Sequence, residues 1–445
     1  MPELIRKKKK MSSFEMIAFG FAGVIVLGAI ILMLPISSSA GVVTPFDKTL
    51  FTATSAVCVT GLVVVDTGSY WSAFGQAVIL LLIQTGGLGV ITVVASFSMV
   101  SGRKISLMQR STMQDAISAP KVGGIVRLTK FILQGTFLVE QIGAILMLPV
   151  FCRDYGWKGI WMSVFHSVSA FCNAGFDILG TTEQTFPSLT GYIANPLINL
   201  VVMLLIVIGG IGFLTWDDFC TNKWKLKRYR LQSKIILVTT AVLILLPAIF
   251  FFLNDFAGFS VGKRILASLF QSVTLRTAGF NTADLGAMSD SSKAIMILLM
   301  LIGGSPGSTA GGMKTTTIAV LILNAFATFG REPETEVFGR RFDNTVVKNA
   351  ATIAILYFFL FFAGGIAISQ IEHVALSDCL FETASAVGTA GLTLGITTEL
   401  GLVSHLILVV LMYLGRVGGL TLIYAAISVK TQSGAKRPLD KITVG

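Results

Sequence analysis

The sequence carries little charge for its length. Acidic and basic side chains make up 13% of the 445 residues, which is roughly half their share in an ordinary soluble domain. Hydrophobic residues make up 53%, and the mean hydropathy is +0.80. A soluble protein of this composition would expose large apolar patches. The shortage of charge therefore excludes disordered, fibrous and ordinary soluble chains and predicts that the bilayer is the solvent.

Residue types that often carry catalysis or bind metals are also scarce. The five cysteines form no CxxC pair and show no metal-ligand spacing, so we interpret them as packing residues: Cys58, Cys152, Cys172, Cys220 and Cys379. The three histidines are far apart in the sequence, at His166, His373 and His405. No Ser-His-Asp, paired-carboxylate or His-Glu pattern is found, and the solvated loops are too short for a catalytic domain. We expect neither an enzyme nor a bound cofactor.

Long apolar runs are abundant. Eight of them have roughly the twenty residues needed to cross the hydrocarbon core, and they predict spans at 14–34, 73–99, 126–151, 194–217, 234–253, 292–325, 347–370 and 402–429. The first run follows a basic segment, has no clear cleavage site and is too long for a signal-peptide core. We therefore expect it to be retained as the first span.

A shorter amphipathic segment separates each odd-numbered span from the next. Each segment has about a dozen residues, too few to cross, which is typical of a re-entrant or interfacial helix. They lie at Pro45–Ala56, Trp157–Ala170, Val261–Val273 and Ala375–Ala386. Four such segments at matching places call for one common explanation.

That explanation is a fourfold repeat. Each short segment contains a Phe and, nine or ten residues later, a Gly followed by an apolar residue. The glycines are Gly61, Gly175, Gly279 and Gly391, about 110 residues apart. The predicted fold is an all-α membrane protein of four parallel span–pore helix–span repeats. The predicted divisions are 1–13 (basic N-terminus), 14–102 (repeat 1), 103–222 (repeat 2 with the loop before it), 223–330 (repeat 3), 331–430 (repeat 4) and 431–445 (tail).

A second glycine cluster follows in every repeat. The clusters are Gly86–Gly89, Gly209–Gly212, Gly303–Gly304 and Gly415–Gly419. Glycine permits close helix approach in membranes. Close packing therefore explains any single cluster as well as a functional role does.

The net charge of +11 is informative through its placement. Of 34 Lys and Arg residues, 25 fall in the N-terminus, the even-numbered loops and the tail. The positive-inside rule makes that face cytoplasmic, with both termini inside and all four short helices entering from outside. The charge thus reports topology, and we expect no nucleic-acid partner. The outer loops hold eleven acids and six bases, which fits either a vestibule that concentrates cations or ordinary loop solubility.

Four re-entrant helices, each followed by a Gly-bearing loop, have the parts of a cation filter. Backbone carbonyls replace the hydration shell of the ion, and each helix C-terminus directs its partial negative charge toward the cavity. Glycine permits the backbone conformations this requires. Non-helical backbone at membrane depth is tolerated only where it lines a cavity or is buried in protein.

These features resemble the superfamily of Trk, Ktr and HKT potassium transporters over essentially the whole chain, and most of all the membrane subunit of Ktr-type systems. The resemblance implies a filter that binds K⁺ at the backbone carbonyls of Val59, Thr60, Gly61, Asn173, Ala174, Gly175, Thr277, Ala278, Gly279, Thr389, Ala390 and Gly391. It further implies potassium uptake, with sodium affecting or accompanying it in some members. The implied setting is a homodimer in the lipid of the bacterial cell membrane, regulated by a cytoplasmic RCK-type nucleotide-binding ring (KtrA-like).

The third repeat departs from the others because it is one residue shorter. Aligned from the glycine, Arg276 takes the place of Cys58, Cys172 and Gly388. A buried charge is tolerated only when it is paired. We therefore predict that Arg276 points behind the filter and pairs with Glu382 of the fourth pore helix.

The sixth span contains a dense Gly/Ser/Pro stretch that must break the helix. It lacks the strand and the spacing of a phosphate-binding loop. The resemblance assigns it to a gate below the filter, together with a deep Arg in span eight; a passive kink and a structural tie to carbonyls are the respective alternatives. The gate residues are Gly303, Gly304, Ser305, Pro306, Gly307, Ser308, Thr309, Ala310, Gly311, Gly312, Lys314 and Arg416.

Three other functions compete with potassium uptake. A carrier built from inverted repeats is disfavoured because these repeats are parallel. A membrane enzyme is disfavoured because catalytic clusters are missing. A sodium or ammonium channel of the same architecture is compatible with the sequence. The basic loops at 103–130, 217–234 and 328–348 either contact the regulator or serve topology alone.

Overall fold

Four long helices form the frame of the molecule. The computed structural model describes residues 12–100, 105–117 and 123–418. The long helices are α1 (Ser13–Met33), α7 (Ile125–Tyr155), α11 (Leu231–Asn254) and α15 (Asn344–Glu372). By length and composition each can cross a membrane. They coincide with the first, third, fifth and seventh predicted spans.

The four short helices are also where the sequence predicts them. They are α2 (Phe46–Cys58), α8 (Lys158–Phe171), α12 (Val261–Thr274) and α16 (Leu376–Gly388). Each packs against the long helix before it: α1 with α2, α7 with α8, α11 with α12 and α15 with α16. The C-terminal halves of these helices are buried. The span and pore-helix part of the repeat is therefore confirmed.

The even-numbered spans differ from the prediction, because those at 73–99, 194–217 and 292–325 are not continuous helices. The second is split into α4 (Ala73–Leu88) and α5 (Val90–Val100), bent by 98°, and the fourth into α9 (Pro196–Gly210) and α10 (Phe213–Asn222), bent by 97°. The breaks fall at Gly89 (φ 85°) and Gly212 (φ 89°), a conformation that only glycine adopts readily.

The sixth predicted span is also broken, and the helix of the eighth stops at Val417. The sixth consists of α13 (Asp290–Leu301) and α14 (Thr315–Phe329), joined by the non-helical residues 302–314. In the eighth, α17 (Leu402–Val417) stops before Gly418, whose φ of 89° equals that of Gly212. The predicted continuation to residue 429 lies outside the described residues. The second glycine clusters are thus helix breaks as well as close contacts.

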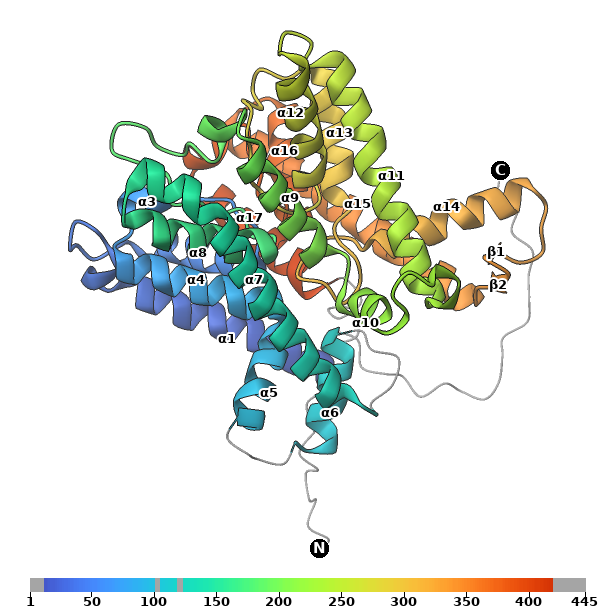
Figure 1. Ribbon diagram of the computed structural model, residues 1–445. Coiled ribbons are helices and arrows are strands. Elements are labelled where there is room, and N and C mark those ends of the chain that lie inside the picture. Colours follow the sequence, from blue (N-terminus) through green and yellow to red (C-terminus); the bar gives the residue numbers. More distant parts are fainter. Residues whose placement is uncertain (1–11, 101–104, 118–122, 419–445) are drawn as a thin grey trace, which may run out of the picture.

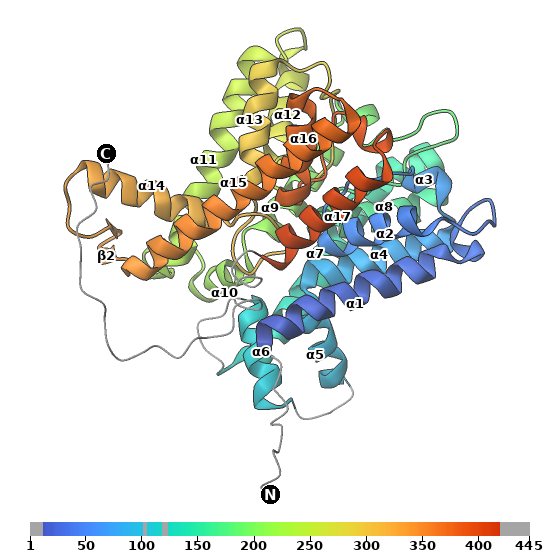
Figure 2. The same cartoon turned by 180° about the vertical axis from the view of Figure 1, so that it is seen from behind.

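The four repeats close into a ring. The helix that follows each pore helix contacts the pore helix of the next repeat: α4 with α8, α9 with α12, α13 with α16, and α17 with α2. Figure 2 shows the last of these contacts, with α17 lying beside α2 and α1. The chain is therefore an all-α, multi-pass membrane protein of four parallel span–pore helix–span repeats around one axis.

The remaining elements are short. They are α3 (Thr67–Tyr70), α6 (Leu107–Ile117), the hairpin of β1 (Glu336–Val337) and β2 (Arg340–Arg341), and 3₁₀ turns at Pro35–Ser37, Thr190–Tyr192, Leu226–Arg228 and Ile396–Thr398. Figure 1 shows α5, α6, α10 and the hairpin toward its lower and right side, away from the α11–α12 connection at the top. The repeat boundaries stay a prediction, and most of the two predicted termini lies outside the described residues.

The five cysteines are free thiols. Cys58, Cys172 and Cys379 are buried, as packing residues should be. Cys152 is half-buried, whereas Cys220 is exposed on α10. The packing interpretation is therefore wrong for Cys220.

Candidate ion pathway

Every pore helix is followed, within three residues of its end, by a residue in the left-handed region. These residues occupy the same position in the four repeats: Val59 (φ 56°), Asn173 (φ 59°), Thr277 (φ 60°) and Thr389 (φ 52°). Positive φ is uncommon for residues other than glycine, and such residues gather at functional sites. Two residues later each repeat has a glycine with positive φ, between 68° and 98°. The four loops therefore share one backbone course.

The four glycines meet at the centre of the ring. A Cβ added to each would collide with the carbonyl oxygen of the residue before the glycine of the next repeat. The pairs are Gly61 with Ala174 (2.6 Å), Gly175 with Ala278 (2.8 Å), Gly279 with Ala390 (3.0 Å) and Gly391 with Thr60. The order of contacts runs once around the four repeats and closes. Carbonyls from four loops are thus gathered around one point.

The amide groups of the middle filter residues all point back to their own pore helix. Each donates a hydrogen bond to a carbonyl one turn earlier: Thr60 to Ser55 (2.8 Å), Ala174 to Ser169 (2.8 Å), Ala278 to Thr274 (3.0 Å) and Ala390 to Ser385 (2.7 Å). The same hydrogen bond in all four repeats fixes the orientation of the peptide groups.

Three threonine hydroxyls in the loops fit a cation. The Oγ1 atoms of Thr60, Thr277 and Thr389 are buried and have no hydrogen-bond partner among the described residues. A buried hydroxyl without a partner is costly, and native proteins rarely leave one unexplained. A dehydrated monovalent cation takes oxygen ligands of this kind together with backbone carbonyls. These hydroxyls and carbonyls are therefore compatible with the ion site that the sequence predicts.

The predicted pair of Arg276 and Glu382 is wrong. Arg276 is 5% exposed, and its Nε and NH2 atoms have no partner in the described part of the chain. Glu382 instead accepts hydrogen bonds from Thr393, Leu394 and Thr397. These neutral donors lie on the segment after the filter of the same repeat and occupy both carboxylate oxygens.

The glycine-rich segment 302–314 lies directly against the loops predicted to form the filter. Its base is closed by hydrogen bonds from the Gly303 amide to Met313 (2.8 Å) and from the Thr315 amide to Gly304 (3.0 Å). At its far end, Gly311 packs so closely on Thr389 that a Cβ would overlap the threonine hydroxyl. We call residues 305–312, which lie between the closed base positions, the intramembrane loop.

The α9–α10 break holds the intramembrane loop from the side. The Ser305 amide donates to Gly210 (3.0 Å), the Thr309 amide to Gly209 (3.2 Å), and the Phe213 amide to Gly307 (2.7 Å). The Thr309 hydroxyl also contacts Asn173, the first filter residue of repeat 2 (3.2 Å). The loop therefore touches the predicted filter loops of repeats 2 and 4.

Two cations lie beside this loop. Arg416 donates to the carbonyls of Thr309, Gly86 and Gly87, which joins the loop to the end of α4. Lys314 donates to the carbonyls of Ala310 (2.8 Å) and Gly311 (3.3 Å). Both side chains line a cavity of about 250 Å³ bounded also by residues of α1 and α6. The alternative interpretation of Arg416, a structural tie to backbone carbonyls, predicts partners of this kind.

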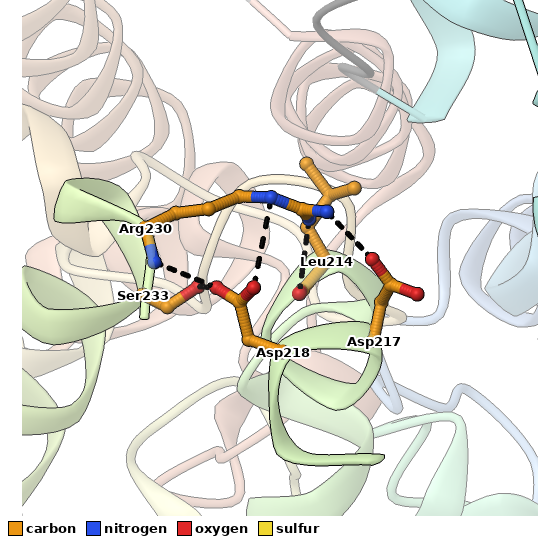
Figure 3. Close-up of polar contacts among 5 residues, drawn as sticks. All are labelled: Leu214, Asp217, Asp218, Arg230 and Ser233. Atoms are coloured by element: carbon orange, nitrogen blue, oxygen red, sulfur yellow. Dashed lines mark hydrogen bonds and ion pairs between the residues drawn. The ribbon is translucent and has the colours of Figure 1, made fainter. Parts of the chain in front are cut away.

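Helix α10 is anchored at its other end by an ion-pair network, shown in Figure 3. Arg230 contacts Asp217 (2.6 Å) and Asp218 (3.6 Å), and its NH1 donates to the Leu214 carbonyl (3.4 Å). Asp218 also accepts from the Ser233 hydroxyl (2.6 Å) on α11. Because the Phe213 amide binds the intramembrane loop, this network fixes the element that supports the loop.

Sequence reasoning missed two features of this site. One is the network of Asp217, Asp218 and Arg230. The excess of positive charge in this loop indicates topology and does not indicate which acids and bases form ion pairs. The hydroxyl side chains of the pore helices, by contrast, occur at one position in all four aligned segments, four residues after the Phe. That regularity is visible in the sequence alone.

The chain is similar to known transport proteins. The chain matches the TrkH family, described as a cation transport protein, over residues 11–435. It is 37% identical to the potassium/sodium uptake protein NtpJ of Enterococcus hirae, over 99% of both chains. It is 36% identical to the Ktr system potassium uptake protein B of Bacillus subtilis, over 97% of this chain and 96% of the relative. Among solved structures, the potassium transporter TrkH from Vibrio parahaemolyticus has the same fold (TM-score 0.75, 17% identity, 96% of this chain and 87% of that chain).

Proposed function

Because the chain belongs to the TrkH family of cation transport proteins, we propose that it takes up potassium across the bacterial cell membrane. The K⁺ ion binds the backbone carbonyls of the four filter loops, at Val59–Gly61, Asn173–Gly175, Thr277–Gly279 and Thr389–Gly391. The observation that carries this proposal is the closed cycle of contacts between the glycines and the carbonyls of the next repeat. Such a ring of carbonyls replaces the hydration shell of the ion.

The intramembrane loop and Arg416 form the gate of this pathway. The loop lies against Thr389 and Asn173, so it fills the space next to the filter. Residues 305–312 are not part of a helix, so the loop can move without unfolding one. Arg416 adds a positive charge that opposes cation passage as long as the loop is in place.

The remaining parts of the proposal concern topology and partners. The basic loops face the cytoplasm. Helices α5 and α10, which are the second parts of the two bent spans, lie on that side together with α6. A cytoplasmic RCK-type nucleotide-binding ring acts on this face of a homodimer. The name of the Bacillus subtilis relative describes one protein of a Ktr system, which supports a multi-component assembly.

Sodium is the second candidate substrate. The Enterococcus hirae relative is named for both potassium and sodium. Neutral oxygen ligands bind either ion, and the geometry of the cage decides between them. Sodium therefore belongs in every flux experiment on this protein.

The proposal predicts potassium flux through the purified protein. In proteoliposomes with an outward or inward K⁺ gradient, we expect K⁺ flux at least about tenfold above that of empty liposomes, and a smaller Na⁺ flux. The measurement is isotope or dye-reported flux with K⁺, Na⁺ and NH₄⁺ gradients in parallel. Flux of NH₄⁺ or Na⁺ alone would assign the protein to a different cation, and absence of flux for all three ions would overturn the proposal.

A further inference from the structure

The pore helices share a hydroxyl that supports the filter. It lies four residues after Phe51, Phe165, Phe270 and Phe381, at Ser55, Ser169, Thr274 and Ser385. In repeats 1, 2 and 3 this hydroxyl forms a hydrogen bond with the extended filter segment, which we call the filter strand. Ser55 accepts from the Gly61 amide (3.1 Å). Ser169 and Thr274 donate to the carbonyls of Phe176 and Phe280, each directly after the filter glycine.

Repeat 4 breaks this rule. The Ser385 hydroxyl is buried and has no partner among the described residues. No hydroxyl of this pore helix therefore holds the outer end of its filter strand. The inner end is still held by the Ala390 amide, which donates to the Ser385 carbonyl (2.7 Å).

Glu382 supplies the missing support. Its side chain is fully buried (0% exposed) on the pore helix α16. One carboxylate oxygen accepts from the Thr393 hydroxyl (2.6 Å) and the Leu394 amide (3.1 Å), and the other accepts from the Thr397 hydroxyl (2.6 Å). These donors begin two residues after the filter glycine Gly391. Hydrogen bonds to a carboxylate are stronger than those between neutral groups.

The equivalent residues of the other repeats do not play this part. They are Thr52, His166 and Gln271, which directly follow Phe51, Phe165 and Phe270, and each is buried. Thr52 donates to Lys48 of its own helix (2.9 Å), His166 contacts Met162 of its own helix (2.7 Å), and Gln271 contacts Met296. A polar residue at this position thus reaches its own filter segment only in repeat 4.

We propose that Glu382 is the positioning residue that fixes the outer end of the fourth filter strand and thereby sets the discrimination between K⁺ and Na⁺. The inference rests on the proposed function, because it concerns the selectivity of that filter. A carbonyl cage admits the smaller ion when its walls can move inward. The three hydrogen bonds that this buried carboxylate accepts prevent that movement at Thr393 and Leu394, and so at the carbonyls before them.

The test compares K⁺ and Na⁺ flux through variants in proteoliposomes. Glu382→Met removes all three acceptor contacts at similar side-chain length, and we expect the K⁺/Na⁺ flux ratio to fall about tenfold, which corresponds to about 1.4 kcal/mol. Thr397→Val removes one hydroxyl with nearly unchanged shape, and its ratio should fall about threefold. The double variant should be no less selective than Glu382→Met alone, because both changes act through the same contact.

The control is Thr52→Val, the same pore-helix position in repeat 1, whose hydroxyl bonds only its own helix. We expect the wild-type ratio there. A merely structural role for Glu382 would lower the amount of folded protein and reduce K⁺ and Na⁺ flux equally, leaving the ratio unchanged. If Glu382→Met does not insert, Thr397→Val decides. A wild-type ratio in Thr397→Val and in any folded Glu382 variant overturns the inference, whereas a wild-type protein without K⁺ flux overturns the proposed function instead.

Discussion

Replacing Gly175 by Ala should reduce potassium flux at least about 100-fold, which corresponds to about 2.7 kcal/mol in a barrier. The added Cβ would lie 2.7 Å from the Cα of Gly279 and 2.8 Å from the Ala278 oxygen. Both neighbours are backbone atoms of the next filter loop, so neither can swing aside as a side chain would. The carbonyl that takes part in ion binding must move. The measurement is K⁺ flux in proteoliposomes, normalised to the amount of protein inserted.

A matched control separates crowding from backbone strain. Gly41 has the same φ as Gly175, 68°, and a Cβ there would meet nothing within 4 Å. Gly41→Ala therefore carries only the strain of a left-handed alanine, about 1–3 kcal/mol of stability, and should conduct like the wild type. Equal flux in Gly175→Ala and Gly41→Ala would show that the glycine ring is not on the ion pathway.

The repeat architecture could be predicted because its signals are local. A Phe, a small-residue stretch and a Gly recur in each unit, and the four short helices and the four long ones lie within a few residues of their predicted ranges. The left-handed residues that begin each filter were not visible in this way. Val59, Asn173, Thr277 and Thr389 are four positions with three residue types, and their shared conformation follows from the tertiary ring rather than from intrinsic preference.

The breaks in the even-numbered spans could not be separated from close packing. Gly86 and Gly87 do pack closely, the first against the Val57 carbonyl and the second against Cys172. Gly89, in the same cluster, ends the helix. Hydropathy treats the three alike, because an apolar run continues across the break. Only the positive φ of Gly89 distinguishes a hinge from a packing contact.

The wrong partner for Arg276 has a related cause. Pairing opposite charges assumes that no neutral donor is nearer to the carboxylate. Thr393, Leu394 and Thr397 are such donors, and they lie on the segment that returns along the same pore helix. Ser/Thr residues downstream of a filter glycine are therefore worth testing as partners before a distant charge is considered.

Shortening the intramembrane loop should raise potassium flux about tenfold. Replacing residues 306–311 by two glycines removes the part that lies against Thr389 and Asn173. The closed base remains, because the hydrogen bonds of Gly303 with Met313 and of Gly304 with Thr315 fall outside the replaced segment. The helices α13 and α14 therefore keep their junction while the space beside the filter is vacated. The measurement is the initial rate of K⁺ flux at a fixed gradient.

The control for this variant leaves the loop in place. Ser308→Ala removes only the hydrogen bond from the Ser308 hydroxyl to the Ser305 carbonyl (2.7 Å), within the loop. We expect a flux close to that of the wild type, since this half-buried hydrogen bond lies within the loop and contacts neither Thr389 nor Asn173. Unchanged or abolished flux in a correctly folded short-loop variant would count against gating.

Arg416 should restrict potassium flux partly by holding the same loop in place. Its guanidinium holds the Thr309 carbonyl on one side and the Gly86 and Gly87 carbonyls on the other. Arg416→Gln in the full-length protein loosens the loop and removes the charge, so flux should rise. In the short-loop background Thr309 is gone, and only the charge remains to be removed. The effect of Arg416→Gln should therefore be clearly smaller there than in the full-length protein, as expected for two changes that share a contact. Equal effects in both backgrounds would mean that Arg416 works as an electrostatic barrier alone and that the loop is a passive break in the helix.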